Sequence, residues 1–319
     1  MRIEDILSIS SGAGFERAAL ELFAFQAERC APYREYLSLT GVDPATVGSV
    51  KEIPFLPIEL FKSHRVYCGE GEPEIVFTSS TTGGGEPSRH FMARKADYEK
   101  TFAAAFSLFY GSPAGHSIYA LLPGYLEREG SSLVYMAGHL IAEGGGGFYL
   151  DRYDLMLKDM ERDSKPKILL GVSYALLDLA EKHAPKLRDT IVMETGGMKG
   201  RREEMPKEAF HALLCEAFGV EAVHSEYGMA ELSSQAYSSG GGVFRTPPWM
   251  RVVVRDPNDP FASMPQGSAG GVDIIDLANI SSCAFIQTQD LGIVHPDGGF
   301  SILGRADRSE IRGCNLLIQ

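Results

Sequence analysis

Apolar and polar residues alternate along this chain with two different periods. From Phe15 to Leu39 the apolar residues recur at helical spacing, which predicts one or two helices. Between residues 75 and 225, short apolar runs rich in β-branched residues alternate with longer stretches of helical period. Such alternation is typical of parallel sheets covered by helices, so the sequence predicts an α/β protein with two helix-covered, mainly parallel sheets.

The same pattern assigns individual elements. Strands are expected at residues 75–78, 117–122, 147–150, 167–170, 190–194 and 222–225. Helices are expected at residues 58–63, 95–110, 131–142, 151–163, 173–183 and 203–218.

The pattern changes after three consecutive glycines, Gly240 to Gly242. Residues 247–303 contain short apolar runs separated by turns and have no helical period, which predicts a small antiparallel β subdomain. We therefore expect an α/β core with two sheet lobes at residues 1–246 and a β subdomain of the same core at residues 247–304. Residues 305–319 would form a hinge remnant and a C-terminal tail.

Composition narrows the class of protein. A hydrophobic fraction of 44% and a charged fraction of 23% are ordinary for a globular protein, and no apolar run approaches the length of a membrane helix. The net charge of −12 disfavours nucleic acid as a partner. The five cysteines form no CxxC pair and the first residues lack a long apolar segment, so we expect a cytoplasmic protein without structural zinc or disulfides.

A loop rich in hydroxyl groups and glycine follows the first expected strand, within the segment VFTSSTTGGGEPSRH at residues 76–90. Backbone N–H groups without obstructing side chains can point together at an anion, and hydroxyl groups add further donors. The Walker and Rossmann glycine patterns are both absent. The loop therefore predicts either a phosphate site of another kind or a plain surface loop.

Four later segments carry further candidate residues, three of them after expected strands. They are Gly196 with Gly197, the run Tyr227-Gly228-Met229-Ala230-Glu231, Asp290, and Arg305. Ligands of open α/β sheets bind beyond the carboxyl ends of the strands, which is where the first two segments lie. Asp290 is expected at a turn between two short strands. Taken singly, each has a structural alternative: a tight turn, a packed ring, a helix cap or a solvated charge.

Taken in order, these segments resemble the motifs of the adenylate-forming superfamily of acyl-CoA synthetases, adenylation domains and luciferases. Residues 78–83 (TSSTTG) are similar to its phosphate loop, residues 227–231 (YGMAE) to its Tyr-Gly-x-Thr-Glu motif, and residues 304–307 (GRAD) to the start of its hinge motif. Within the superfamily, the chain most resembles the acyl-protein synthetases of bacterial bioluminescence. The pointers are residues 122–128 and 131–134 and the ending at residues 312–317, which contains Cys314.

The resemblance implies ATP and Mg²⁺ as cofactors, a hydrophobic fatty or aryl carboxylate as substrate, and an acyl-reductase or acyl-carrier partner. It assigns catalytic roles to Thr81, Glu231 and Cys314, with Glu231 as the metal ligand and Cys314 as the acyl acceptor. The implied nucleotide contacts are Thr78, Ser79, Ser80, Thr82, Gly83, Gly196, Gly197, Tyr227, Gly228, Met229, Asp290 and Arg305.

The chain also departs from the superfamily pattern. Ser80 stands where glycine is usual, Ser88 follows Pro87 where lysine is usual, and the large C-terminal lid with its late lysine is not expected here. Two alternatives therefore stay open beside the acyl-protein synthetase. One is an acyl- or aryl-CoA ligase that uses a separate lid domain, and the other is a non-catalytic adenylate-binding module. Cys314 itself has the alternative of a small buried apolar residue.

Overall fold

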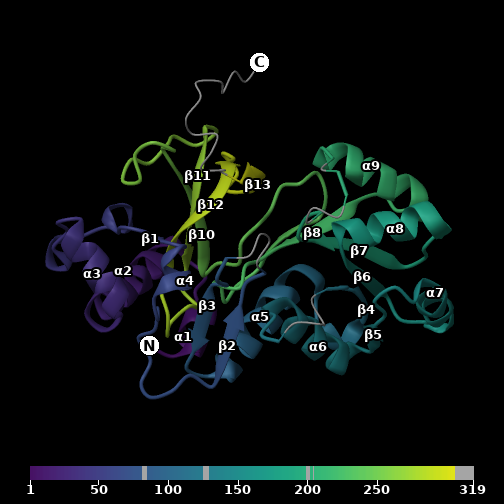
Figure 1. Ribbon diagram of the computed structural model, residues 1–319, viewed down its shortest axis with the longest axis horizontal. Coiled ribbons are helices and arrows are strands. Elements are labelled where there is room, and N and C mark those ends of the chain that lie inside the picture. Colours follow the sequence, from purple (N-terminus) through teal and green to yellow (C-terminus); the bar gives the residue numbers. More distant parts are fainter. Residues whose placement is uncertain (81–84, 125–128, 199–201, 204, 306–319) are drawn as a thin grey trace.

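The computed structural model describes residues 1–80, 85–124, 129–198, 202–203 and 205–305. Its elements form N-terminal helices, a helix-covered sheet, a second, mainly antiparallel sheet and a separate two-stranded sheet (Figure 1). The helices are α1 Ile3–Leu7, α2 Gly12–Arg29, α3 Ala31–Leu39, α4 Leu60–Ser63, α5 Lys95–Tyr110, α6 Ser132–Gly144, α7 Tyr153–Arg162, α8 Ser173–His183 and α9 Lys207–Phe218, with short 3₁₀ turns at Pro44–Thr46, Val50–Glu52 and Pro113–Gly115. The strands are β1 Leu56–Pro57, β2 Ile75–Thr78, β3 Arg89–Met92, β4 Ser117–Leu121, β5 Gly146–Phe148, β6 Lys167–Val172, β7 Thr190–Thr195, β8 Val223–Tyr227, β9 Ala236–Ser238, β10 Met250–Arg255, β11 Ala269–Asp276, β12 Phe285–Val294 and β13 Phe300–Arg305.

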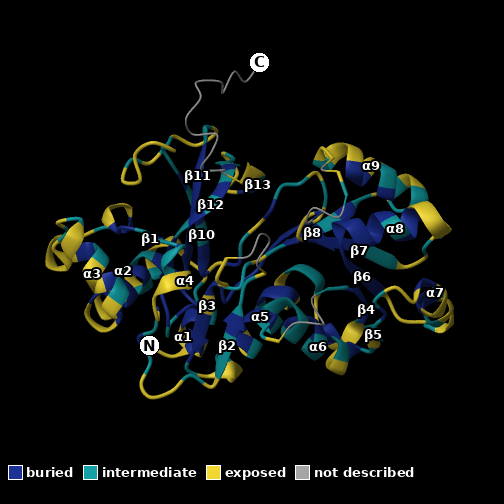
Figure 2. Cartoon of the chain, in the orientation of Figure 1, coloured by how far each residue is buried: buried dark blue, intermediate teal, exposed yellow. Residues whose placement is uncertain are grey.

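The helix-covered sheet has six strands in the order β5-β4-β6-β7-β8-β9. All neighbours are parallel except β9, which runs antiparallel to β8. Helices α5 and α6 lie on one side of it and α8 and α9 on the other (Figure 1). Strands β4 and β6 are buried at every position, as strands covered on both faces must be, and Figure 2 shows the exposed residues on the outer faces of the helices.

The second sheet runs in the order β1-β12-β11-β10, and β13 also pairs with β12. Its pairs are antiparallel apart from the short parallel pairing of β1 with β12. The antiparallel structure expected after residue 247 is therefore confirmed. The turn expected at Asp290 is wrong, because Asp290 lies inside the ten-residue strand β12 and pairs with Arg305 of β13. The pairing of β12 with β13 has a register shift beside Gly292, and the strand continues past this glycine, which the sequence analysis placed in the turn.

The expected α/β class is confirmed, with one difference in detail. In the part of the chain that the structure describes, the helix-covered parallel strands form a single sheet, whereas β2 and β3 form a separate antiparallel hairpin. Several expected elements agree residue for residue, among them β2, α5 and α8. The helical pattern of residues 15–39 divides into α2 and α3 at Cys30, where the backbone is extended, and Pro32 lies in the first turn of the next helix.

Buried polar contacts join the N-terminal helices to the second sheet. The Gln26 side-chain amide of α2 donates to the carbonyl oxygen of Asn279 at 2.9 Å and accepts from the backbone N–H of Ala284 at 2.9 Å. Phe23, Tyr33 and Phe285 pack their rings together in the same place.

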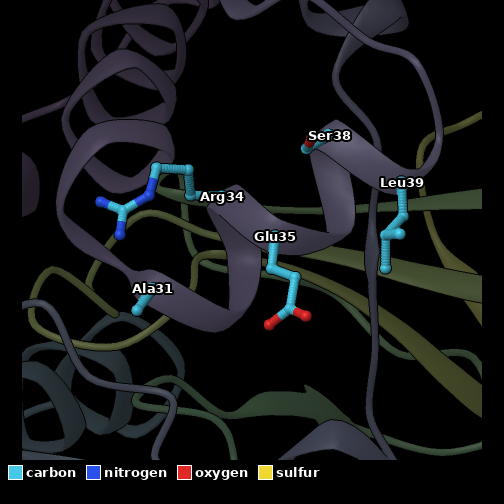
Figure 3. Close-up of a pocket in the computed structure, with 5 residues that line it drawn as sticks. All are labelled: Ala31, Arg34, Glu35, Ser38 and Leu39. Atoms are coloured by element: carbon cyan, nitrogen blue, oxygen red, sulfur yellow. The ribbon is translucent and has the colours of Figure 1, made fainter.

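Helix α3 also borders a surface hollow lined by Ala31, Arg34, Glu35, Ser38 and Leu39 (Figure 3). Within the described ranges, every helix falls short of the length and apolarity that a bilayer span requires.

Candidate functional site

The two sheets approach each other at a cluster of three side chains that the sequence analysis selected. The Tyr227 hydroxyl, at the end of β8, donates to Asp290 Oδ2 of β12 at 2.7 Å. Arg305 Nε of β13 lies 3.4 Å from Asp290 Oδ1, and the backbones of the two residues are paired in the sheet. Asp290 is 7% exposed. One buried carboxylate therefore connects the carboxyl edge of the parallel sheet to the antiparallel sheet.

Aromatic packing holds Tyr227 in this position. Its ring centroid lies 5.7 Å from that of Phe244 and 5.5 Å from that of Phe300, and the latter two rings stack on each other. Burial and the neighbouring Asp290 carboxylate raise the pKa of Tyr227 well above its ordinary value. The hydroxyl is therefore a proton donor to Asp290 throughout the neutral range.

Glu231 lies just beyond β8 and is 5% exposed. Burial raises its pKa, while a hydrogen bond with Ser88 and the charges of Arg305 and Lys62 act in the opposite direction. The Lys62 side chain belongs to α4, which packs against β3 through the rings of Phe61 and His90. A carboxyl group thus faces two cations and a hydroxyl group at one edge of the site.

The two ends of the glycine-rich loop are joined by hydrogen bonds next to Glu231. The backbone N–H of Ser79 donates to the carbonyl oxygen of Ser88 at 3.1 Å, and the N–H of Ser88 donates to Ser79 Oγ at 2.9 Å. Thr78, the last residue of β2, donates its N–H to the carbonyl oxygen of Gly130 at 2.8 Å. Ser80 is exposed. The loop therefore begins and ends beside the candidate carboxylate, and Ser88 connects the two.

Two residues that sequence reasoning missed position this region. His90 is completely buried, with Nδ1 2.8 Å from the carbonyl oxygen of Ala230 and Nε2 2.8 Å from Asn279 Oδ1. The Asn279 amide in turn donates to the carbonyl oxygens of Glu231 and Cys283, each at 2.9 Å. Burial lowers the pKa of His90. These contacts span 140 and 189 residues of sequence, so no local pattern could have indicated them.

A buried carboxylate orders the segment that follows Glu231. Asp276 accepts hydrogen bonds from the backbone N–H groups of Ser233 and Ser234, both at 2.8 Å, and from Ser234 Oγ at 2.6 Å. Trp249 Nε1 donates to the same Ser234 oxygen at 2.9 Å. The turn that carries Glu231 is therefore anchored to the second sheet and not only to its own strand.

The glycine pair at the end of β7 is held by a different network. Gly196 has φ of +73°, a left-handed conformation that favours glycine, and its carbonyl oxygen accepts from Ser173 Oγ at 3.1 Å. Ser173 also contacts Glu194, whose carboxylate lies 2.8 Å from Lys207 Nζ and 3.0 Å from His211 Nε2. Burial would raise the pKa of Glu194, but the His211 hydrogen bond and the Lys207 charge outweigh it and lower the pKa to about 2.

The other residues that the sequence analysis selected lie beside the Tyr227 turn, at the end of β7 or outside the described residues. Gly228 is exposed and Met229 is half-buried beside the Tyr227 turn, and Gly197 has open space at its Cα. Thr81, Thr82, Gly83 and Cys314 lie outside the described residues. The structure thus brings together Tyr227, Glu231, Asp290 and Arg305 with the ends of the glycine-rich loop. Within the described ranges, no three His, Cys, Asp or Glu side chains gather closely enough to hold a metal ion by themselves.

Comparison with solved structures identifies the class of the fold as that of adenylate-forming ligases. A 2-hydroxyisobutyryl-CoA ligase in its postadenylation state, in complex with 2-HIB-AMP, matches with a TM-score of 0.68 at 16% identity, over 94% of this chain and 70% of that chain. ATP-bound MatB from Rhodopseudomonas palustris matches with a TM-score of 0.57 at 17% identity, over 74% of this chain and 49% of that chain. At these identities the likeness establishes the fold alone.

Sequence comparison gives a narrower likeness. Residues 167–319 match the family described as "Acyl-protein synthetase, LuxE". The long-chain-fatty-acid–luciferin-component ligase of Vibrio harveyi is 26% identical over 139 residues, which are 40% of this chain and 36% of that protein. The resemblance to the adenylate-forming superfamily, and within it to the acyl-protein synthetases, is confirmed. The match spans little more than a third of the length of this curated relative.

Proposed function

We propose that this protein activates a hydrophobic carboxylic acid with ATP and then transfers the acyl group to a thiol. In the first step a carboxylate oxygen attacks the α-phosphorus, a P–O bond forms, and pyrophosphate leaves, which gives acyl-AMP. In the second step a thiolate attacks the acyl carbonyl, a C–S bond forms, and AMP leaves. The same chemistry accounts for both the fold and the family likeness.

The observation that carries this proposal is the Tyr227–Asp290–Arg305 cluster beside Glu231. Asp290 is oriented by a tyrosine that donates to one oxygen, and its other oxygen lies toward Arg305. A carboxylate oriented in this way can accept hydrogen bonds from the two hydroxyl groups of a ribose. The phosphates would then extend toward the glycine-rich loop, where Thr78, Ser79, Ser80, Thr81, Thr82 and Gly83 would supply donors, and the base toward Gly196, Gly197, Gly228 and Met229.

The donor set also fits Mg²⁺. Magnesium is usually bound through one or two carboxylates together with substrate phosphates, and Glu231 is one carboxylate at the edge of the loop that would hold those phosphates. Glu231 with the neighbouring Ser88 hydroxyl would hold the ion. When bound, the ion would neutralise charge that builds up on phosphate oxygens. Arg305 and Lys62 add fixed positive charge to the same place.

Cys314 is the proposed acyl acceptor, and Arg308 and Arg312 would favour its thiolate form. A fatty acid is the first substrate to test, because the relative from Vibrio harveyi is a long-chain-fatty-acid ligase. An acyl reductase or an acyl carrier would consume the thioester. We also propose a cytoplasmic location, since free thiols persist in a reducing compartment.

Carboxylate-dependent exchange of pyrophosphate into ATP tests the first step. We expect exchange with one or more acids in a series of fatty and aryl carboxylates of varied length. The Glu231→Gln variant should lose it by roughly 10²- to 10³-fold, because a charged group aimed at the phosphates is removed. Glu35→Gln, on the exposed face of α3, is the matched control and should retain exchange. Binding of ATP without exchange for any acid would contradict the enzymatic proposal and favour the non-catalytic module.

Covalent acylation tests the second step. We expect Cys314→Ser to retain pyrophosphate exchange but to lose the thioester-linked acyl group detected by mass spectrometry. Cys215→Ser, at a half-buried cysteine of α9, is the control and should still become acylated. A thioester formed on CoA in the Cys314→Ser variant would instead select the CoA ligase, and loss of exchange as well would mean that Cys314 is not a simple acceptor.

A further inference from the structure

Glu226 is a buried carboxyl group that the proposed chemistry leaves without a role. It precedes Tyr227 in β8 and therefore points to the opposite face of the sheet. The residue is 8% exposed, and Oε2 accepts a hydrogen bond from Thr195 Oγ1 at 2.5 Å. Thr195 is its register partner in β7 and directly precedes the Gly196-Gly197 pair. One contact of Glu226 therefore reaches the end of the neighbouring strand.

The other carboxyl oxygen lies against the turn after β8. A Cβ atom placed on Gly228 would lie 2.5 Å from Glu226 Oε1 and 3.5 Å from Gln235 Cγ. Glu226 and Gln235 thus meet at the same glycine. Among the described residues, Gln235 Oε1 is buried and has no hydrogen-bond partner, whereas the Gln235 side chain also bonds the Tyr98 hydroxyl. Glu226 Oε1 and the Gln235 side chain therefore lie against the same glycine, and the oxygen of that amide has no donor among the described residues.

The surroundings of Glu226 are aromatic and contain no balancing cation in the described part of the chain. Burial raises the pKa values of Tyr98 and Tyr110 of α5 and of Tyr237 of β9, and the Glu226 charge raises them further, so all three lie close to Glu226. His224 of the same strand contacts the Tyr110 hydroxyl at 3.2 Å, and burial lowers its pKa, so it is neutral there. An ionised carboxylate in such a place loses its hydration without gaining a counter-ion.

We infer that Glu226 is a positioning residue that acts as a neutral carboxylic acid. It accepts from Thr195 and donates its proton to Gln235, so that one side chain joins the end of β7 to the turn after β8. Burial supports this, because it raises the pKa of Glu226 to about 7 although the Thr195 hydrogen bond acts in the opposite direction. The neutral form supplies the donor that the buried Gln235 oxygen otherwise lacks.

The inference rests on the proposed function, because the two segments that Glu226 joins are those proposed to hold the base and to orient Asp290. When Glu226 ionises, its donor to Gln235 disappears and a bare charge is buried between the segments. ATP binding should therefore weaken as pH rises through the neutral range, with Glu226 as the titrating group. A carboxamide at this position would keep both a donor and an acceptor but could not ionise.

The test compares ATP binding by calorimetry in the wild type and in Glu226→Gln between about pH 6 and pH 8, on either side of the pKa of about 7 to which burial raises Glu226. We expect the wild-type affinity to fall by about tenfold for each pKa unit that separates the free from the ATP-bound protein. The affinity of Glu226→Gln should lack this component of the pH dependence, so that only the change shared by both proteins remains. Burial raises the pKa of Asp273 to about 7 as well, but Asp273 is present in both proteins, so their difference isolates Glu226.

A second variant tests the partner of Glu226. Gln235→Met removes the acceptor at nearly constant volume, so the neutral form of Glu226 loses a hydrogen bond and the fall in affinity should move to lower pH. Parallel pH profiles in the wild type and Glu226→Gln, with ATP bound to both, would overturn the inference and leave the proposed function intact. Absence of ATP binding in both proteins at every pH would overturn the nucleotide site itself. In that case thermal unfolding of the two ligand-free proteins against pH still decides the protonation, because coincident profiles would refute a neutral Glu226.

Discussion

Replacing Tyr227 by phenylalanine removes one hydroxyl group from the contact between the two sheets. The ring can keep its packing against Phe244 and Phe300, so the change isolates the hydrogen bond to Asp290. A hydrogen bond to a charged group contributes about 1.5–3 kcal/mol. The remaining charge partner, Arg305, is 68% exposed and lies 3.4 Å away, so its contribution is under about 1 kcal/mol. We therefore expect Tyr227→Phe to lower the free energy of unfolding by about 2 kcal/mol.

The chain contains its own probe for this measurement. Trp249 is the single tryptophan, is buried, and bonds Ser234 in the segment after Glu231. Urea unfolding followed by its fluorescence gives the stabilities of the wild type, Tyr227→Phe, Asp290→Asn and the double variant. The coupling energy of this cycle should be about 1–2 kcal/mol, because the two groups contact each other directly.

A matched control separates a local effect on the site from a general loss of stability. Tyr119→Phe removes a similar bond, from the Tyr119 hydroxyl to Asp163 Oδ2 at 2.9 Å, at a place that supplies none of the candidate site residues. Both variants should lose comparable stability, but only Tyr227→Phe should also weaken ATP binding, by about tenfold for each 1.4 kcal/mol of lost interaction. A coupling energy near zero, or equal effects of both variants on ATP binding, would refute the role given to the Tyr227–Asp290 contact.

Two further predictions concern the strand ends beside the site. The pKa of Glu194, lowered to about 2, implies that its contribution to stability is present above its ordinary pKa and is lost as pH falls from about 4.5 to 2. Denaturation measured against pH should therefore show a steeper acid loss in the wild type than in Glu194→Gln, and coincident slopes would contradict the ion pairing with His211. Gly228→Ala places a Cβ atom 2.5 Å from Glu226 Oε1 and should destabilise the protein by about 1–3 kcal/mol. Gly197→Ala meets no atom within 4 Å and should be close to neutral, so equal melting temperatures of the two variants would argue against the packing described for Gly228.

Much of the fold was predictable because secondary structure follows from local periodicity. Helices α5 and α8 agree with the expected ranges because their apolar residues recur regularly over many positions, and strand β2 agrees because a short β-branched apolar run is bounded by polar residues. Asp290 shows where local reasoning fails. A polar segment with a following glycine resembles a turn, yet pairing with β11 and β13 on its two sides keeps it in a strand.

The candidate site likewise contains residues that local sequence predicted and residues that only the structure revealed. The sequence motifs singled out Tyr227, Glu231, Asp290 and Arg305, whereas nothing local pointed to His90 or Asn279, which support the same turn from distant segments. Thr81, Thr82, Gly83 and Cys314 remain predictions from the sequence, since they lie outside the described residues.

By itself, the sequence determined the alternation of strands and helices, the antiparallel segment after residue 247 and the order of the candidate motifs, because these depend on neighbouring residues. Only the tertiary structure decided that Tyr227 donates to Asp290, 63 residues later, and that Glu226 is buried with no counter-ion among the described residues. Hydrogen-bond partners and protonation states depend on which distant groups exclude water from a side chain, and that is a property of the packed chain.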